Sequence, residues 1–241
     1  GATKLVGEKL TLAPTHGAGG MRTAAVRYGN VAGSTGSVIP TWRALLADGA
    51  TAVPVRAPQA TRFWLTIQEA VDLVLWTAER MIGGELVVPL FDAAGKIVSF
   101  YGRRVQSGDV RHLYPPGPHR GVFNPAALDT PEVILCEAVL DALTFCAHGF
   151  ANATCIYGTE GMTEEIWERL RKARKVFVAY DADDAGDRAA ERDTARLKSV
   201  GVEVARVRFP WGLDANAYAL KVQPAAKSLA LLLQAAAVDA P

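Results

Sequence analysis

Residues 175–186 read Lys-Val-Phe-Val-Ala-Tyr-Asp-Ala-Asp-Asp-Ala-Gly, an apolar run that ends in acidic residues. The apolar part, residues 175–180, is short and rich in β-branched and aromatic side chains, which predicts a buried strand. A long helix is expected over residues 185–200, and Gly201 ends it. A short strand followed by a helix is the repeating unit of a parallel α/β sheet.

The same alternation continues on both sides of this stretch. Further strands are expected at residues 133–136, 153–157 and 202–207, and helices at residues 138–148, 163–173 and 215–221. The pattern predicts an α/β fold over residues 131–221, a Rossmann-like four-stranded parallel sheet with flanking helices. The apolar stretch 228–238 is too short to span a membrane and predicts a docking helix, so residues 222–241 are expected to form a helical tail.

Residues 1–130 lack this alternation and predict a smaller, mixed α+β subdomain. Residues 11–40 are rich in Gly, Ser, Thr and Pro, which is typical of loops with short strands, and a short helix is expected at 42–47. Two strands, at residues 85–90 and 97–101, flank a turn. Residues 105–120 are expected to form an irregular, basic loop.

One longer helix is expected within this subdomain, from Thr66 to about residue 81. Thr66 and Glu69 have the spacing of a capping box, in which each side chain bonds the other residue's backbone N–H. We expect the apolar residues of this helix to pack inward, namely Val71, Leu73, Val74 and Trp76.

The composition excludes several classes of protein. The chain has 241 residues, half of them hydrophobic, and 26 Lys+Arg against 25 Asp+Glu, which argues against a disordered polycation or an acidic tail. It has no apolar run of about 18 residues and no signal-peptide pattern. Its three cysteines lack the Cys-x-x-Cys spacing of a zinc ribbon. We therefore expect a cytoplasmic protein without a membrane partner.

The two parts of the chain differ in charge. Residues 1–130 carry 13 Lys+Arg and 9 Asp+Glu, whereas residues 131–241 carry 13 and 16. A basic part followed by an acidic part suits a protein that grips an anionic polymer and holds a metal ion beside it. A difference of this size is also compatible with ordinary scatter.

Acidic residues follow two of the predicted strands. Glu137 comes after the first strand, and Asp181 and Asp183 come after the third. Because the carboxyl ends of parallel strands meet at one edge of a sheet, these carboxylates could surround one Mg²⁺ ion. The alternative is a helix N-terminus, whose dipole favours acidic residues, and we prefer it for Asp184 and Asp187.

Several motifs resemble the topoisomerase–primase (Toprim) domain. They are Glu137 after a strand, Gly158-Thr159, and the Asp-Ala-Asp of residues 181–183 with the Ala-Gly that follows. Residues 83–92 and 99–105 are similar to the amino-terminal part of the catalytic core of bacterial-type DNA primases. Residues 213–218 resemble the Asp-Pro-Asn-Asp motif that closes the primase Toprim unit. The resemblance covers about residues 83–220.

The sequence departs from the family pattern at several positions. Ala138 and Ala182 stand where Gly is usual, which removes no carboxylate. Leu213 and Ala215 replace a basic residue and a proline, and Glu160 is a further candidate acidic ligand. No zinc ribbon is found in these residues: it lies outside this sequence, has been replaced, or never existed. A phage or mobile-element relative of the primases would fit such compaction.

The resemblance implies a function in DNA replication. A primase core would synthesise short primers on single-stranded DNA from nucleoside triphosphates, and a replicative helicase or polymerase could be its partner. Mg²⁺ or Mn²⁺ would be held by the candidate catalytic residues Glu137, Asp181 and Asp183. Asp141, one helical turn after Glu137, is either a further ligand or a structural acid of its helix. Four arginines are candidates for binding nucleic-acid or triphosphate oxygens, namely Arg103, Arg104, Arg111 and Arg120.

Three interpretations compete at this point. The first is a DNA-directed primase, a nucleotidyltransferase with an amino-terminal basic primase-type subdomain (1–130) and a Toprim metal-binding catalytic domain (131–221). The second is a Toprim-type nuclease, which would use the same metal site to hydrolyse phosphodiesters. The third is a non-catalytic nucleic-acid-binding module of a larger replication protein. The basic segment before residue 121 favours synthesis, and the retained carboxylates argue against a pure binding module.

Overall fold

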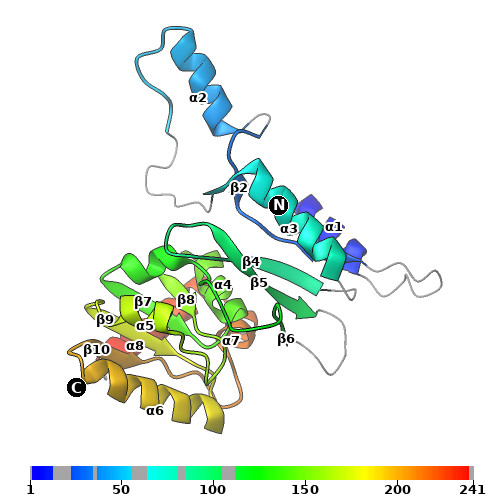
Figure 1. Ribbon diagram of the computed structural model, residues 1–241. Coiled ribbons are helices and arrows are strands. Elements are labelled where there is room, and N and C mark those ends of the chain that lie inside the picture. The colour runs from blue at the N-terminus through cyan, green and yellow to red at the C-terminus, as the bar shows by residue number, and fades with distance from the viewer. Residues whose placement is uncertain are drawn as a thin grey trace, which may run out of the picture. The chain divides into compact units, whose positions relative to one another are not determined.

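The chain folds into two compact units. The computed structural model describes residues 2–12, 23–34, 37–55, 64–80, 85–104 and 112–238. Unit 1 comprises Gly1–Pro89 and Phe100–Pro116, and unit 2 comprises Leu90–Ser99 and Gly117–Pro241. The division falls within two successive strands, β4 (Glu85–Phe91) and β5 (Ile97–Arg104), which Figure 1 shows side by side. The boundaries expected at residues 130 and 221 stay predictions.

Unit 2 is built on a parallel sheet of four strands in the order β10-β9-β7-β8. The strands are β7 (Glu132–Cys136), β8 (Ala153–Cys155), β9 (Lys175–Ala179) and β10 (Glu203–Arg206). This sheet confirms the predicted α/β fold. β7 and β9 are neighbours, with Cys136 opposite Ala179, so the residues that follow these two strands leave the sheet at the same edge.

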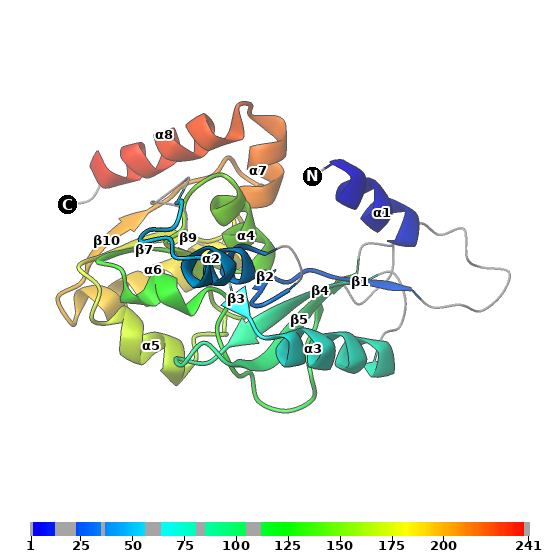
Figure 2. The same ribbon diagram turned by 90° about the horizontal axis from the view of Figure 1, so that it is seen from above.

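Helices cover both faces of this sheet. They are α4 (Val139–Ala147), α5 (Glu164–Leu170), α6 (Asp184–Lys198), α7 (Ala215–Lys221) and α8 (Ala225–Val238), and a short 3₁₀ helix, η2 (Pro125–Asp129), precedes β7. Figure 2 shows α8 on one side of the sheet and α5 on the other. α8 packs against α7 and buries Leu229 completely. The docking role expected for residues 222–241 stays a prediction. None of the described helices combines the length and the apolar character needed to cross a membrane.

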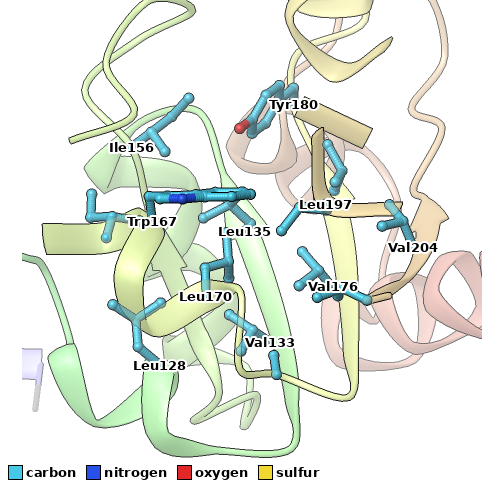
Figure 3. Packing of buried hydrophobic residues seen from close by; sticks show 14 of the residues in the cluster. Leu128, Val133, Leu135, Ile156, Trp167, Leu170, Val176, Tyr180, Leu197 and Val204 are labelled. Atoms are coloured by element: carbon cyan, nitrogen blue, oxygen red, sulfur yellow. The ribbon is translucent and has the colours of Figure 1, made fainter. Parts of the chain in front are cut away.

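The core of unit 2 follows the alternation of its strands. Val133 and Leu135 of β7 are fully buried and point to the face covered by α5 and α6, where Trp167 and Leu170 meet them (Figure 3). The guanidinium carbon of Arg196 lies 3.7 Å from the centre of the Trp167 ring and closes this layer from outside.

Unit 1 is the predicted mixed α+β part. Its helices are α1 (Ala2–Leu12), α2 (Val38–Ala47) and α3 (Ile67–Arg80), and its short strands are β1 (Ala24–Val26), β2 (Asn30–Val31), β3 (Trp64–Leu65) and β6 (His112–Leu113). β1 runs parallel to β4, and β6 runs antiparallel to β5, in a sheet of order β1-β4-β5-β6. β2 and β3 form a separate parallel pair.

The helix after Thr66 shows both a confirmed and a wrong prediction. The capping box is present: the Thr66 amide donates to Glu69 Oε2 over 2.7 Å, and the Glu69 amide donates to Thr66 Oγ1 over 3.1 Å. Leu73 is fully buried as expected, but Val71 and Val74 are 43% and 46% exposed. The helical period explains the error, because residues three and four positions from Leu73 share its buried face and residues one and two positions away do not.

Replacing a core residue of unit 2 tests this packing. Leu135→Ala should lower the free energy of unfolding by about 2–5 kcal/mol, since it removes buried methyl groups and leaves a cavity between β7 and α5. Leu231→Ala on α8, where the side chain is 54% exposed, should change it by less than about 0.5 kcal/mol. Urea unfolding monitored by tryptophan fluorescence measures both, and equal losses would contradict the described core.

Candidate metal centre

Two carboxylates leave neighbouring strands at the same edge of the unit 2 sheet. Glu137 directly follows β7, and Asp181 follows β9 by two residues. The main chain at Glu137 is held from the β8 side, because the Gly158 amide donates to the Glu137 carbonyl oxygen over 3.1 Å. The predicted Gly-Thr loop after β8 therefore fixes one side of the site.

Both carboxylates have a buried oxygen that lacks a partner. Glu137 Oε2 and Asp181 Oδ1 are buried and accept no hydrogen bond from any described residue. A buried carboxylate oxygen without a donor costs free energy, and a bound cation would offset that cost. Carboxylate oxygens are the ligands that Mg²⁺ prefers, so the two residues fit a divalent ion.

The electrostatics of the site point the same way. Burial, followed by repulsion from Asp181 and Asp183, raises the pKa of Glu137 to about 7. Burial, followed by repulsion from Asp214 and Asp183, raises the pKa of Asp181 to about 6. Each carboxylate thus lies within electrostatic reach of several others, and a cation among them would favour their ionised forms.

Asp141 lies deepest in this group. Asp141 is only 4% exposed. Burial, followed by repulsion from Asp181 and Asp214, raises the pKa of its carboxyl group well above the ordinary range. Asp141 Oδ1 accepts the Asn216 amide over 3.3 Å. This bond connects α4 to the start of α7, where the predicted closing motif lies.

Asp183 has a structural task as well as a predicted catalytic one. It is the N-cap of α6, and its Oδ1 accepts the Gly186 amide over 2.7 Å. Asp184 and Asp187 lie in the first turn of α6, as we expected. The helix can approach β9 this closely because residue 186 is glycine: a Cβ atom there would overlap the Asp181 carbonyl oxygen.

The carboxylates are near one another without converging on one point. Within the part of the chain that the structure describes, no group of three or more His, Cys, Asp or Glu side chains stands ready to hold a metal ion. A bound ion would have to draw Glu137 and Asp181 together.

Glu160, a further candidate ligand, is engaged elsewhere. Its Oε1 accepts Arg192 Nη1 over 2.9 Å, and its side chain is 88% exposed. Arg192 also donates to the buried Asp193, which in turn accepts the Tyr180 hydroxyl over 2.8 Å. This chain of bonds anchors the loop after β8 to the residue that precedes Asp181.

Arg103 belongs to unit 1, where it contacts a histidine. Arg103 Nη1 lies 2.6 Å from His112 Nε2, and the buried Tyr101 hydroxyl lies 3.1 Å from His112 Nδ1. Because arginine can only donate, Nε2 is the acceptor, and Nδ1 carries the proton that it donates to Tyr101. This arrangement fixes the ring and aligns Arg103 along β5.

The other candidate arginines are placed differently. Arg104 is half-buried at the end of β5, Arg120 is exposed in unit 2, and Arg111 lies outside the described residues. The main chain beside Arg120 is held by Tyr157, whose hydroxyl donates to the Arg120 carbonyl oxygen over 2.8 Å. The His119 ring stacks on Tyr157 at 4.4 Å.

The sequence analysis placed Asp214 in the closing motif but not among the candidate ligands, and it did not consider Arg206. Asp214 caps α7 through the Ala217 amide at 2.5 Å and raises the pKa of Asp181. Its place before a helix, after the fourth strand, was a usable signal, because that loop reaches the same edge of the sheet. Arg206 of β10 gave no comparable signal, since its contacts, to main-chain carbonyls and to the Asp187 carboxylate, are distant in sequence.

Two family models match this chain in different parts. Residues 134–219 match the Toprim-like family, and residues 1–111 match the family described as polysaccharide biosynthesis protein. The first match agrees with the motifs at the strand ends. The second shows that residues 1–111, expected to belong to a primase-type subdomain, are similar to a family of another kind.

Curated relatives divide in the same way. A UDP-N-acetylglucosamine 4,6-dehydratase (inverting) of Campylobacter jejuni is 44% identical over 91 residues, 37% of this chain and 27% of the relative. A DNA primase of Aquifex aeolicus is 31% identical over 146 residues, 55% of this chain and 29% of the relative. The chain thus spans less than a third of either relative. A continuous stretch of 55% of the chain must include Arg120 and part of the sequence before residue 131.

Solved structures show the same fold. The zinc-binding and RNA polymerase domains of the Aquifex aeolicus primase align with a TM-score of 0.55 at 24% identity, covering 68% of this chain and 46% of that one. At this identity the likeness is one of fold. Taken together, the family match, the primase relatives and the fold support a Toprim DNA primase catalytic core.

The raised pKa of Glu137 predicts how stability depends on pH. An acid with a higher pKa in the folded state binds its proton more tightly when folded. Its contribution to stability is therefore complete below its ordinary pKa of 4.5 and is lost as the pH rises through about 7. The free energy of unfolding of the metal-free protein should fall between about pH 5 and about pH 8, as measured by urea unfolding.

Two comparisons decide whether the site causes this slope. Glu137→Gln should reduce the slope, and Glu164→Gln, at the exposed start of α5, should leave it unchanged. Added Mg²⁺ should raise the stability of the original protein most at about pH 8, where the carboxylates are ionised. An identical slope in Glu137→Gln would contradict the electrostatic description of the site.

Proposed function

We propose, from the premise that residues 134–219 form a Toprim domain of the DNA primase type, that the chain is a primase-like nucleotidyltransferase. It would synthesise short primers on single-stranded DNA from nucleoside triphosphates, and it would act in the cytoplasm. The chain covers less than a third of its primase relatives, so the activity of a whole primase is part of the proposal.

One observation carries this proposal: the unpartnered, buried oxygens of Glu137 and Asp181 at neighbouring strand ends. Nothing in the described packing needs two repelling carboxylates at this position. A divalent cation explains them, and the primase relatives supply the reaction class.

The site residues would have separate tasks. When bound, Mg²⁺ or Mn²⁺ would supply the charge neutralisation that phosphoryl chemistry requires. Glu137 and Asp181 would hold the ion through the oxygens that now lack donors, and Asp183 and Asp141 are further candidate ligands. Asp214 acts on Asp181 and Asp141 by repulsion and could complete the set.

The nucleic-acid contacts would come from the arginines. Arg120 is exposed, lies within the stretch similar to primases, and has its main chain fixed by Tyr157. A guanidinium group binds two phosphate oxygens at once, which suits template or triphosphate binding. Arg103 and Arg104 are candidates for the same task, as is Arg111. A helicase or polymerase partner is part of this proposal.

Residues before about 80 would take no part in nucleotidyl transfer. Residues 1–111 match a family of polysaccharide biosynthesis proteins. The basic charge of this segment is partly neutralised within the chain, since Arg27 forms an ion pair with Glu8 at 2.5 Å. Its contribution would therefore be to the fold of unit 1.

Primer synthesis on single-stranded DNA with labelled nucleotides and Mg²⁺ or Mn²⁺ tests the proposal. The original protein should make template-dependent products, and the double variant Asp181→Asn/Asp183→Asn should lose synthesis by more than about 100-fold. Asp184→Asn, in the same helical turn, should retain activity. Shortened DNA in place of new strands, lost in the same double variant, would identify a nuclease. DNA binding without either activity would indicate a binding module.

The arginine assignment has its own test. Arg120→Ala should weaken binding of single-stranded DNA and lower the slope of log affinity against log salt by about 1, because one phosphate contact is lost. Arg27→Ala, which also removes a positive charge, should leave the slope unchanged. Fluorescence anisotropy over a range of salt concentrations measures both. Equal effects of the two substitutions would contradict this division of the chain.

A further inference from the structure

Arg206, the last residue of β10, makes a set of contacts that no other described side chain repeats. Its Nη1 donates to the carbonyl oxygens of Val178 at 3.2 Å and Tyr180 at 3.0 Å. Its Nη2 donates to the Asp181 carbonyl oxygen at 3.3 Å and to Asp187 Oδ1 at 2.9 Å. The side chain is only 15% exposed, so this guanidinium is largely shielded from water.

The carbonyl groups that Arg206 binds lie where the sheet ends. β9 stops at Ala179, and beyond it the ladder with β10 no longer supplies donors. The oxygens of Tyr180 and Asp181 would then need another partner, since buried carbonyl groups are rarely left unpaired. The Val178 carbonyl oxygen still accepts the Val207 amide over 2.9 Å, whereas Arg206 takes the place of the missing ladder bonds at Tyr180 and Asp181. It thereby extends the fixed part of the main chain to Asp181.

The residues after Asp181 are fixed by separate contacts. The Ala182 amide donates to the Leu213 carbonyl oxygen over 3.1 Å, and the Gly212 amide donates to the Ala182 carbonyl oxygen over 2.7 Å. Gly186 of α6 lies against the Asp181 carbonyl oxygen from the helix side. Asp181 is therefore held by Arg206 on one side and by the packing of α6 on the other.

Arg206 also connects the strand to the helix. Through Asp187 it joins the end of β9 to the first turn of α6, whose N-cap is Asp183. The two carboxylates of the Asp-Ala-Asp motif thus depend on one guanidinium: Asp181 through its own main chain, and Asp183 through the position of α6.

We propose that Arg206 is a positioning residue of the metal centre, which holds the end of β9 so that the Asp181 carboxylate meets Glu137 at a divalent cation. The inference that Arg206 serves a metal site rests on the proposed metal-dependent function. The hydrogen bonds of Arg206 to the end of β9 and to α6 are observed independently of that function. Lysine could not replace arginine here, because four acceptors on two elements require the planar fork of a guanidinium. Partners that orient metal ligands in this way typically affect metal affinity by about 10–100-fold.

The positive charge of Arg206 and its hydrogen bonds should have opposite effects on the affinity for a metal ion, and this makes the inference testable. The positive charge of Arg206 repels a cation, so its removal alone should strengthen metal binding. Loss of the hydrogen bonds should weaken it. Arg206→Lys keeps the charge and loses the fork, whereas Arg206→Gln loses both. Arg208, exposed two residues further along the chain, provides the matched control Arg208→Lys.

The first measurement is Mn²⁺ binding, followed by electron paramagnetic resonance with no nucleotide present. Arg206→Lys and Arg206→Gln should each bind Mn²⁺ about tenfold more weakly or worse, and Arg208→Lys should bind as the original protein does. Asp187→Asn, which leaves the carbonyl bonds in place, should have a smaller effect. Unchanged binding in Arg206→Lys, or tighter binding in Arg206→Gln, would overturn the inference.

The second measurement needs no metal. Hydrogen exchange in peptides spanning residues 180–187 should be about tenfold faster in Arg206→Lys than in the original protein or Arg208→Lys, with peptides of β7 unchanged as evidence of an intact fold. Equal exchange would overturn the inference. An original protein that binds no Mn²⁺ would contradict the proposed function, and the exchange comparison would still decide whether Arg206 holds the strand end.

Discussion

The site depends on one constraint: several carboxylates are kept close together at an edge where they repel one another. Burial and mutual repulsion raise the pKa of Glu137, Asp181 and Asp141, so their proximity costs stability. The surrounding main chain tolerates this because it is bonded from several sides, by Gly158 beside Glu137 and by the 212–213 segment beside Ala182. The hydrophobic core beneath, between β7, β9 and the helices α5 and α6, supplies the stability that offsets the cost.

Most of unit 2 could be predicted from sequence because its signals are local. Short apolar runs alternate with helices, and each predicted strand from 133 to 207 is present. The placement of Glu137 and Asp181 at one edge followed from the topology of parallel sheets. Arg206 could not be found in this way, since only the folded chain brings it to the carbonyl groups of the two residues that follow β9.

The elements of unit 1 were harder to predict from the sequence than those of unit 2. Its strands β1, β2 and β3 have two or three residues each, too few to show a period. The sequence analysis did not predict α1. It predicted too wide a buried face for α3, so it placed Val71 and Val74 in the core, although both side chains are exposed. The match of residues 1–111 to a polysaccharide biosynthesis family was also beyond reach, since no motif in residues 1–82 had indicated any function.

The pairing of β1 with β4 bears on how much change in sequence the edge of this sheet can accept. β1 joins the edge of the sheet through only three residue pairs, Ala24 to Val26 against Glu85 to Val87. Such pairing uses main-chain groups, which every sequence carries, so it makes little demand on side-chain identity. The edge of this sheet should therefore tolerate substitutions at residues 24–26, as long as the main chain keeps its extended form.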